Sequence, residues 1–427
     1  MKCFILTLSL LVTASNAYAN TINLSWDWAT SFISTSQRST SFKYENHDAV
    51  QNFNGLVDVQ ADYLAWRGVF SIKVDNAYVN DHYGRDWGGQ AETTFIIREL
   101  VWQDEVTIFG QTWDATVGKV QIDWGVGYGY RTLDLFKPYR QNALDLVAEE
   151  GVTAVALSMF DDSGEWTGLY TNSGWNQQSL TDFEAANEQQ GVGVRRYGLL
   201  GSHEYQLVAY YDDIRQGLLG ASWVTLLDQQ WSLHSSSVIQ NNYYGYQQPL
   251  SVMVPVVLEQ QGHAWQTLVG VSWASETGHK LIAEYWYDSR AWSRSQWQQA
   301  IARSQQLIVA PATTELAYSY AQGFQQTNIV QHNLMLHWQW DLQAWLQWLG
   351  KNSALWLADI TPTLDILYSP QDNGIIATQW LTYQWLDSGD QAVDLEFSAR
   401  FFTGENDSAY ALVSDNYMIA LTVRGRF

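Results

Sequence analysis

The chain has 427 residues, with 22 Lys and Arg against 44 Asp and Glu, a formal charge of −22, and one cysteine, Cys3. A chain this acidic is not expected to bind nucleic acid, because phosphates attract basic surfaces. A single cysteine also excludes a disulfide framework.

The first nineteen residues have the pattern of a secretory signal peptide. Lys2 gives a charged start, an apolar run covers residues 4–13, and Ala17-Tyr18-Ala19 places small residues where signal peptidase cuts. The apolar run is too short to span a bilayer comfortably, so an uncleaved anchor helix is the weaker reading. We expect residues 1–19 to be removed on export to the periplasm and residues 20–427 to form one folded unit.

After the leader no stretch of 18 apolar residues occurs, and the prevailing hydrophobic period is two. This period predicts strands of about ten residues, each with one apolar and one polar face. The 23 Trp, 24 Tyr and 15 Phe are typical of the two aromatic girdles of a membrane barrel, although a soluble aromatic-rich sandwich or propeller has a similar composition. The clearest alternating stretches are 57–63, 70–75, 281–288 and 393–401.

Short and long connections alternate along the chain, as in barrels with short periplasmic turns and long external loops. Counting strands between them predicts an all-β, antiparallel, up-and-down transmembrane β-barrel of about 18 strands, with 16 as the alternative count and both termini periplasmic. Residues 105–120 and 341–368 fit the pattern least well. The predicted short links are 67–68, 103–105, 161–164, 202–203, 228–229, 275–278 and 387–390, and the long ones are 35–55, 80–93, 121–150, 174–192, 241–262, 289–329 and 403–415.

The third long connection is rich in glycines, aromatic residues and charges. Gly125, Gly127 and Gly129 are interleaved with aromatic residues, which favours a loop that turns tightly against a barrel wall. Opposed charges across a narrow aqueous pore set its selectivity, so we predict that this loop folds into the lumen. The predicted constriction residues are Lys119, Asp123, Trp124, Tyr128, Tyr130, Arg131, Asp134, Lys137, Arg140, Glu149 and Glu150.

Part of this segment resembles a known family. "VGKVQIDWG" followed by "YRTLDLFKPYR" is similar to the G-[RK]-x-x-x-x-W-G…R-x-L-D-x-x-x-P pattern of a large family of poorly characterised proteobacterial outer-membrane β-barrels, akin to porins and alginate-export channels. The residues that match the pattern are Gly118, Lys119, Asp123, Trp124, Gly125, Arg131, Asp134 and Pro138. The resemblance implies a Gram-negative outer-membrane barrel with a loop folded into its lumen.

Residues 291–308 differ from the rest of the chain. Trp297 and Ile301 are four apart, with Arg294 and Arg303 nearby, which predicts a short amphipathic helix inside the longest external loop. A surface lid and a gate or plug over the pore mouth remain equally open as its role.

The last strand carries a further signal. Tyr417, Ile419, Leu421, Val423 and Phe427 fall on one face, and the chain ends on that aromatic residue. The pattern resembles the C-terminal signature that the barrel-assembly machinery reads, with Tyr417, Val423 and Phe427 as the expected assembly signal.

No histidine or acidic pair stands on one face at a spacing that indicates catalysis or metal binding. We therefore expect no catalytic residues, no metal and no cofactor, although a hydrolase built from several strands stays open.

The first hypothesis is a channel for small hydrophilic solutes, neutral or cationic. Export of a polysaccharide or lipid-like molecule is the alternative, followed by a barrel enzyme and a structural or adhesive barrel. Expected partners are outer-membrane lipid and lipopolysaccharide, the assembly machinery and the solute, with the oligomeric state open.

Overall fold

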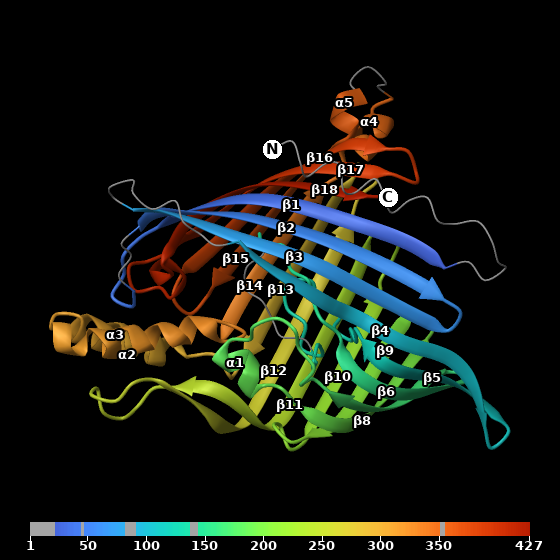
Figure 1. Ribbon diagram of the computed structural model, residues 1–427, viewed down its shortest axis with the longest axis horizontal. Helices are drawn as coiled ribbons and strands as arrows, with labels where there is room; N and C mark the ends of the chain where they lie inside the picture. Colours follow the sequence, from blue (N-terminus) through green and yellow to red (C-terminus); the bar gives the residue numbers. More distant parts are fainter. Residues whose placement is uncertain (1–21, 44–46, 82–90, 137–143, 351–354) are drawn as a thin grey trace.

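The computed structural model describes residues 22–43, 47–81, 91–136, 144–350 and 355–427, and the predicted leader lies outside these ranges. Within them the chain forms one 18-stranded antiparallel sheet (Figure 1). The count of 18 is confirmed, and the alternative of 16 is wrong. The strands are β1 (Asn23–Gln37), β2 (His47–Tyr63), β3 (Trp66–Asp81), β4 (Glu92–Ile108), β5 (Gln111–Val120), β6 (Val152–Asp161), β7 (Gly164–Asn172), β8 (Gln190–Leu200), β9 (His203–Asp212), β10 (Leu218–Leu226), β11 (Trp231–Gln247), β12 (Val257–Ala274), β13 (His279–Asp288), β14 (His332–Trp340), β15 (Ile360–Ser369), β16 (Gly374–Asp387), β17 (Ala392–Thr403) and β18 (Asp415–Arg426).

The sheet closes on itself. Every strand pairs with its neighbours in the chain, and β1 also pairs with β18, from Asp27 opposite Arg426 to Gln37 opposite Asp415. Closure leaves no open strand edge, which is the condition that a sheet must meet in lipid, where no water is present to satisfy the backbone. The predicted up-and-down barrel is therefore confirmed.

The two rims of the barrel differ. The rim where β1 begins and β18 ends carries mostly two- to four-residue links, and we call it the turn rim. The opposite rim carries the longer connections, and we call it the loop rim. Three of its connections matter below: L3 (121–151), L4 (173–189, with α1, Asp182–Ala186) and L7 (289–331, with α2, Arg294–Leu307, and α3, Thr314–Ser319). Short 3₁₀ turns lie at Pro311–Thr313 and Tyr320–Gln325 in L7, and at Tyr410–Leu412 between β17 and β18.

Several predicted connections are misplaced. The first two turns are at 64–65 and 109–110 rather than at 67–68 and 103–105, because strands continue past polar residues that face a wet lumen. Phe109 and Gly110 both have positive φ, +53° and +79°, as a two-residue hairpin turn requires. The links predicted at 35–55 and 241–262 are too long, since β2 begins at His47 and β11 and β12 leave only 248–256 between them. Connections at 213–217, 341–359 and 370–373 were not predicted.

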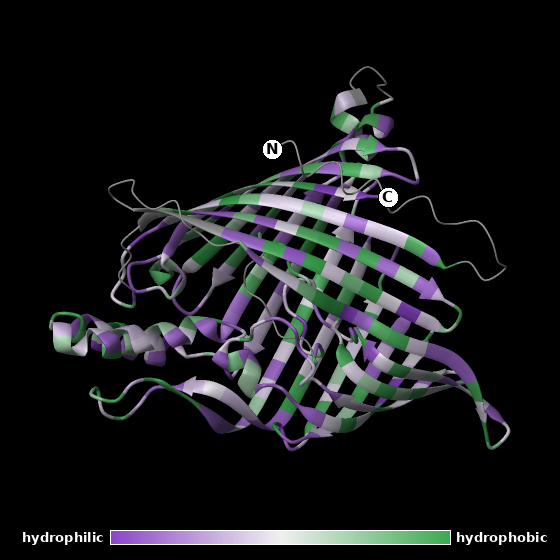
Figure 2. Cartoon of the chain, in the orientation of Figure 1, coloured by the Kyte–Doolittle hydropathy of each residue, from purple (hydrophilic) through white to green (hydrophobic). Residues whose placement is uncertain are grey.

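The side-chain pattern of the wall is the reverse of that of a water-soluble protein. On β18, Leu421 is 53% exposed while the next residue, Thr422, is 2% exposed; on β17, Phe397 is 49% exposed and Ser398 is 1% exposed. Figure 2 shows this alternation as hydrophobic and hydrophilic bands along the strands. Large apolar side chains thus cover the outside and polar ones face inward, which is stable only where the outside meets lipid.

The predicted helix in L7 is present as α2. Ser293 caps it by accepting the backbone N–H of Gln296, while the Gln296 side chain accepts the N–H of Ser293. The apolar face of α2 packs into a core at the loop rim that also includes residues of L1 (38–46) and of the β17–β18 connection. Two further helices, α4 (Leu342–Trp348) and α5 (Leu355–Ala358), lie at the turn rim. Among the described residues no helix is long and apolar enough to cross a membrane.

Candidate functional site

The base of L3 is fastened by a buried ion pair. Lys119, at the end of β5, contacts Glu150, where the chain returns to β6, and the Lys119 side chain is fully buried. Glu150 also accepts the backbone N–H groups of Gln177 and Gln178 in L4, each at 3.0 Å from Oε1. The ammonium of Lys119 lies 5.1 Å from the ring centre of Trp175. The pair therefore joins both ends of L3 to L4, and Glu150 also lines the cavity described below.

The tip of L3 is held on the far wall by Glu284 of β13. The two carboxylate oxygens accept the backbone N–H groups of Tyr128, at 2.7 Å, and Gly129, at 2.8 Å. His234 of β11 lies with Nε2 2.7 Å from the same carboxylate. A fully buried carboxylate with these partners is a strong acceptor. Glu284 thus fixes the place where L3 meets the wall.

The pair formed by His234 and Glu284 reaches across the intervening strand β12. Both residues are in register with Gly270, and a Cβ there would lie 2.2 Å from His234 Nε2 and 2.9 Å from Glu284 Cγ. No other residue leaves this space. The sequence did not predict the pair, because its members come from strands that are not neighbours.

The glycines of L3 allow the close approach that was predicted from them. At Gly127 a Cβ would lie 1.9 Å from the carbonyl oxygen of Tyr130, within the loop. At Gly129 it would lie 2.3 Å from Met335 Sδ of the wall. The loop backbone therefore packs against itself and against β14 in a way that side chains would prevent.

Tyr128 packs beside a second histidine–carboxylate pair. Its ring centre is 4.3 Å from that of His337, whose Nδ1 lies 2.6 Å from Asp365. Burial, together with the charges of Asp365 and Glu284, raises the pKa of Tyr128 to about 12. Tyr128 is therefore neutral at physiological pH.

Asp288, at the end of β13, joins L3 to L7. Its side chain is fully buried. Its Oδ2 accepts three hydrogen bonds, from the Tyr130 hydroxyl at 2.9 Å, from Arg290 Nη2 at 2.8 Å and from Asn328 Nδ2 at 2.8 Å. Arg290 Nη2 also donates to the Tyr130 hydroxyl at 3.0 Å. Burial lowers the pKa of Arg290, but the charge of Asp288 and the Tyr130 contact outweigh it, so the pKa rises. Burial also raises the pKa of Tyr130 well above its ordinary value, and the Asp288 charge adds to this.

The returning half of L3 packs on the wall as a small core. Leu133, Leu135 and Phe136 are buried against residues of β9, β10 and β11. Hydrogen bonds flank this core, since Thr132 donates to Ser236 at 2.7 Å and Arg215 donates to the carbonyl oxygen of Leu135. The described part of L3 is therefore folded against the inside of the barrel, as was predicted.

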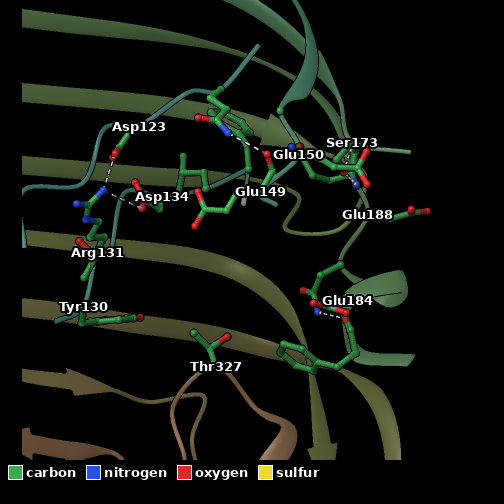
Figure 3. A pocket seen from close by; sticks show the side chains of 18 of the residues that line it. Asp123, Tyr130, Arg131, Asp134, Glu149, Glu150, Ser173, Glu184, Glu188 and Thr327 are labelled. Atoms are coloured by element: carbon green, nitrogen blue, oxygen red, sulfur yellow. Dashed lines mark hydrogen bonds and ion pairs between the residues drawn. The ribbon is translucent and has the colours of Figure 1, made fainter. Parts of the chain in front are cut away.

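A cavity of about 730 Å³ opens between L3, L4 and the wall. Figure 3 shows Asp123, Arg131, Asp134 and Glu149 along L3, with Glu184 of α1 across the cavity. Among the residues that the structure describes, its charged lining residues are seven acids and three arginines: Asp123, Asp134, Asp145, Glu149, Glu150, Glu184 and Glu188, and Arg131, Arg215 and Arg290. Each arginine is already paired with a carboxylate, of Asp123, Asp212 or Asp288 respectively. The cavity is therefore negative.

The other predicted constriction residues have different places. Asp123 pairs with Arg131, which lies 3.8 Å from Asp134, and all three line the cavity. Trp124 packs edge-on against Phe136, with ring centres 5.4 Å apart, beneath the guanidinium of Arg195. Lys137 and Arg140 lie outside the described residues. Within the described part of the chain, no three His, Cys, Asp or Glu side chains gather as a metal site requires.

The terminal strand lies at the closing seam of the barrel. Tyr417 is exposed on the outer face, 6.4 Å from Phe401 between ring centres, and Val423 lies on the same face. Phe427 stacks on Trp26 of β1 at 4.9 Å and donates its N–H to the Trp26 carbonyl oxygen. These contacts give the residues a structural role in closure, while their reading by the assembly machinery stays a prediction.

No protein-family model and no curated protein matches the sequence. The fold resembles that of solved barrels at very low identity. Acinetobacter baumannii OccAB1 is 9% identical with a TM-score of 0.54, covering 95% of this chain and 96% of its own. Pseudomonas aeruginosa OccK7 (OpdD) is 8% identical, TM-score 0.54, and OccK8 (OprE) is 9% identical, TM-score 0.52; each covers 95% of this chain and 98% of its own. The similarity establishes the barrel fold, and the family resemblance of residues 118–138 stays a prediction.

Proposed function

We propose that this protein is a Gram-negative outer-membrane channel that passes small hydrophilic solutes, neutral or cationic, with L3 as its constriction. The observation that carries the proposal is L3 itself, which runs through the lumen and is fastened to the wall by Glu284 and Asp288. A loop that narrows a water-filled barrel without filling it creates a selective pore. The Occ barrels that share the fold are outer-membrane porins, which supports the same role.

The preference for cations follows from the charges of the cavity. Its described lining has seven carboxylates against three arginines, and each arginine is paired with a carboxylate, so the field that a solute meets is negative. In a confined space between low-dielectric walls, such a field concentrates ions of the opposite sign. The same balance disfavours the alternative of exporting an anionic polysaccharide.

Export and assembly complete the proposal. Removal of residues 1–19 in the periplasm and recognition of the terminal strand by the assembly machinery would deliver the barrel to the outer membrane. The long connections would then face lipopolysaccharide and the medium.

Planar bilayers test the channel. Under a KCl gradient we expect a reversal potential of the sign for cation selectivity, reduced in the double variant Glu149→Gln/Glu188→Gln. Glu259→Gln is the matched control, since Glu259 is an exposed acid on the β11–β12 hairpin away from the cavity. Anion selectivity in the wild type would reject the charge argument. Absence of conductance in both the wild type and a Glu284→Gln variant, whose L3 tip is held less firmly, would reject the channel.

A further inference from the structure

One connection at the turn rim departs from the rule that these links are short. Residues 341–359, between β14 and β15, form two helices, α4 and α5, where the neighbouring links are two to four residues long. Figure 1 shows the two helices projecting from the turn rim, and α4 contacts β15.

The surface of these helices is apolar and aromatic. Leu342 and Leu346 of α4 are buried, whereas Trp348 is 61% exposed and Leu349 is 37% exposed. Trp356 of α5 is 63% exposed. No charged residue occurs between Leu342 and Gly350. In water such a surface is unfavourable, because large apolar side chains remain solvated.

The direction of α4 is set by the neighbouring hairpin turn. Asp341 caps the helix by accepting the N–H groups of Gln343, at 2.9 Å, and Ala344, at 3.1 Å, and it donates its own N–H to the Gly278 carbonyl oxygen at 2.8 Å. At Gly278, where φ is +82°, a Cβ would lie 2.2 Å from the Asp341 carbonyl oxygen. The exposed aromatic surface therefore has a defined orientation on the barrel.

This surface continues the lipid-facing side of the wall. Leu334 and Leu336 are 45% and 41% exposed on β14, and Trp338 and Trp340 follow on the same face of that strand. The ring of Trp340 then lies 5.2 Å from that of Trp345 in α4. The apolar wall thus runs through an aromatic band to Trp345 of the helix, past the exposed cap Asp341.

From this continuity we propose that α4 and α5 form an interfacial membrane anchor, with Trp345, Trp348, Leu349 and Trp356 at the boundary between headgroups and acyl chains of the lipid leaflet on the turn side. Tryptophan suits this depth, because its ring is apolar and its N–H can meet water or headgroups. Gln343 and Gln347, both exposed and one helical turn apart, supply the side that faces water. The occupant is lipid rather than a protein because the patch extends a surface that already faces lipid.

A depth measurement tests the anchor. Cys3→Ser removes the only cysteine of the chain, so a single new cysteine can carry an NBD dye. The test sites are Trp348→Cys and Trp356→Cys, in vesicles of phosphatidylcholine containing a lipid with a nitroxide near the top of its acyl chain. Gln347→Cys is the matched control on the polar side of α4, Asp390→Cys reports the β16–β17 turn in water, and Leu336→Cys reports the lipid-facing wall.

We expect labels at 348 and 356 to be quenched by the nitroxide lipid several-fold more than labels at 347 and 390, with blue-shifted emission and protection from aqueous iodide. Quenching at 348 and 356 no stronger than at 390 would overturn the anchor, whether the helices proved to lie in water or under a protein. The inference rests on the barrel lying in lipid, so absence of quenching at 336 would overturn that premise and the anchor together. Loss of quenching at 348 and 356 alone would leave the proposed channel intact.

Discussion

L3 and L7 are both long connections at the loop rim, but different forces hold them. L3 enters the lumen, where Glu284 and Asp288 hold it by polar contacts and a small apolar core packs it on the wall. L7 stays at the rim around an aromatic core that includes Trp292, Trp297 and Tyr320, each at most 2% exposed. The rings of Trp292 and Trp297 lie 4.9 Å apart.

The two loops should therefore respond differently to substitution. Removal of a large side chain weakens an apolar core most, whereas a polar contact is weakened by the loss of one charge. We expect L7 to be the more rigid of the two, and a surface lid and a gate or plug both stay open as the role of α2. Asp288 is the point where the two systems meet.

The largest effect is expected from Asp288→Ala, which removes contacts to both L3 and L7. It leaves Arg290 without its buried partner and removes one of the two acceptors of the Tyr130 hydroxyl, the other being Gln266, a loss of about 3–5 kcal/mol for a broken buried pair. We expect a wider, noisier conductance and faster proteolysis of L7. Asp162→Ala, an exposed turn residue, is the control. Unchanged conductance together with unchanged proteolysis would show that Asp288 does not join the loops.

Trp297→Ala should destabilise L7 and leave L3 unchanged. Removing this 1%-exposed ring costs about 3–5 kcal/mol within the L7 core. Limited proteolysis should then cut L7 much faster, while ion selectivity, which depends on L3, stays the same. Gln298→Ala, exposed on the same helix, should leave both unchanged. A shift in selectivity in Trp297→Ala would mean that L7, and not L3 alone, sets the pore.

Glu284→Gln should have the opposite effect, loosening L3 and leaving L7 unchanged. The amide keeps one acceptor for Tyr128 or Gly129 but loses the charge that faces His234, a change of about 1–3 kcal/mol. Single-channel recordings should show a larger mean conductance, and L7 should resist protease as in the wild type. Wild-type conductance in this variant would contradict the role given to Glu284.

The smallest effect concerns Tyr128 and appears only at high pH. The pKa of Tyr128 in the folded protein is about 12, above the ordinary value of 10. The stability that the neutral side chain gives to L3 is therefore complete below about pH 10 and is lost as the pH rises towards 12. Conductance should therefore increase over this range in the wild type and much less in Tyr128→Phe. Equal pH dependence in the two proteins would assign the transition to another group.

Local pattern was sufficient for much of the fold. The alternation of 281–288 assigns Glu284 to the polar face, and the same period gives the strand count, the closing strand and the absence of helical spans. Composition was a poorer guide to turns, because Arg67-Gly68 and the run 103–105 lie inside strands whose polar residues face the lumen. The helices of 341–359 were missed for a related reason, since an apolar aromatic run reads equally well as strand.

The sequence by itself determined that this chain is a lipid-facing closed sheet with a glycine-rich loop in its third long connection, because period two and spacing are properties of neighbouring residues. Only the tertiary structure decided what that loop touches. Glu284 meets His234 because both stand opposite Gly270 in the register of β11, β12 and β13, and Asp288 meets Tyr130 because L3 crosses the lumen. Strand register and the path of L3 thus bring together residues 50 and 158 positions apart, which no local pattern specifies.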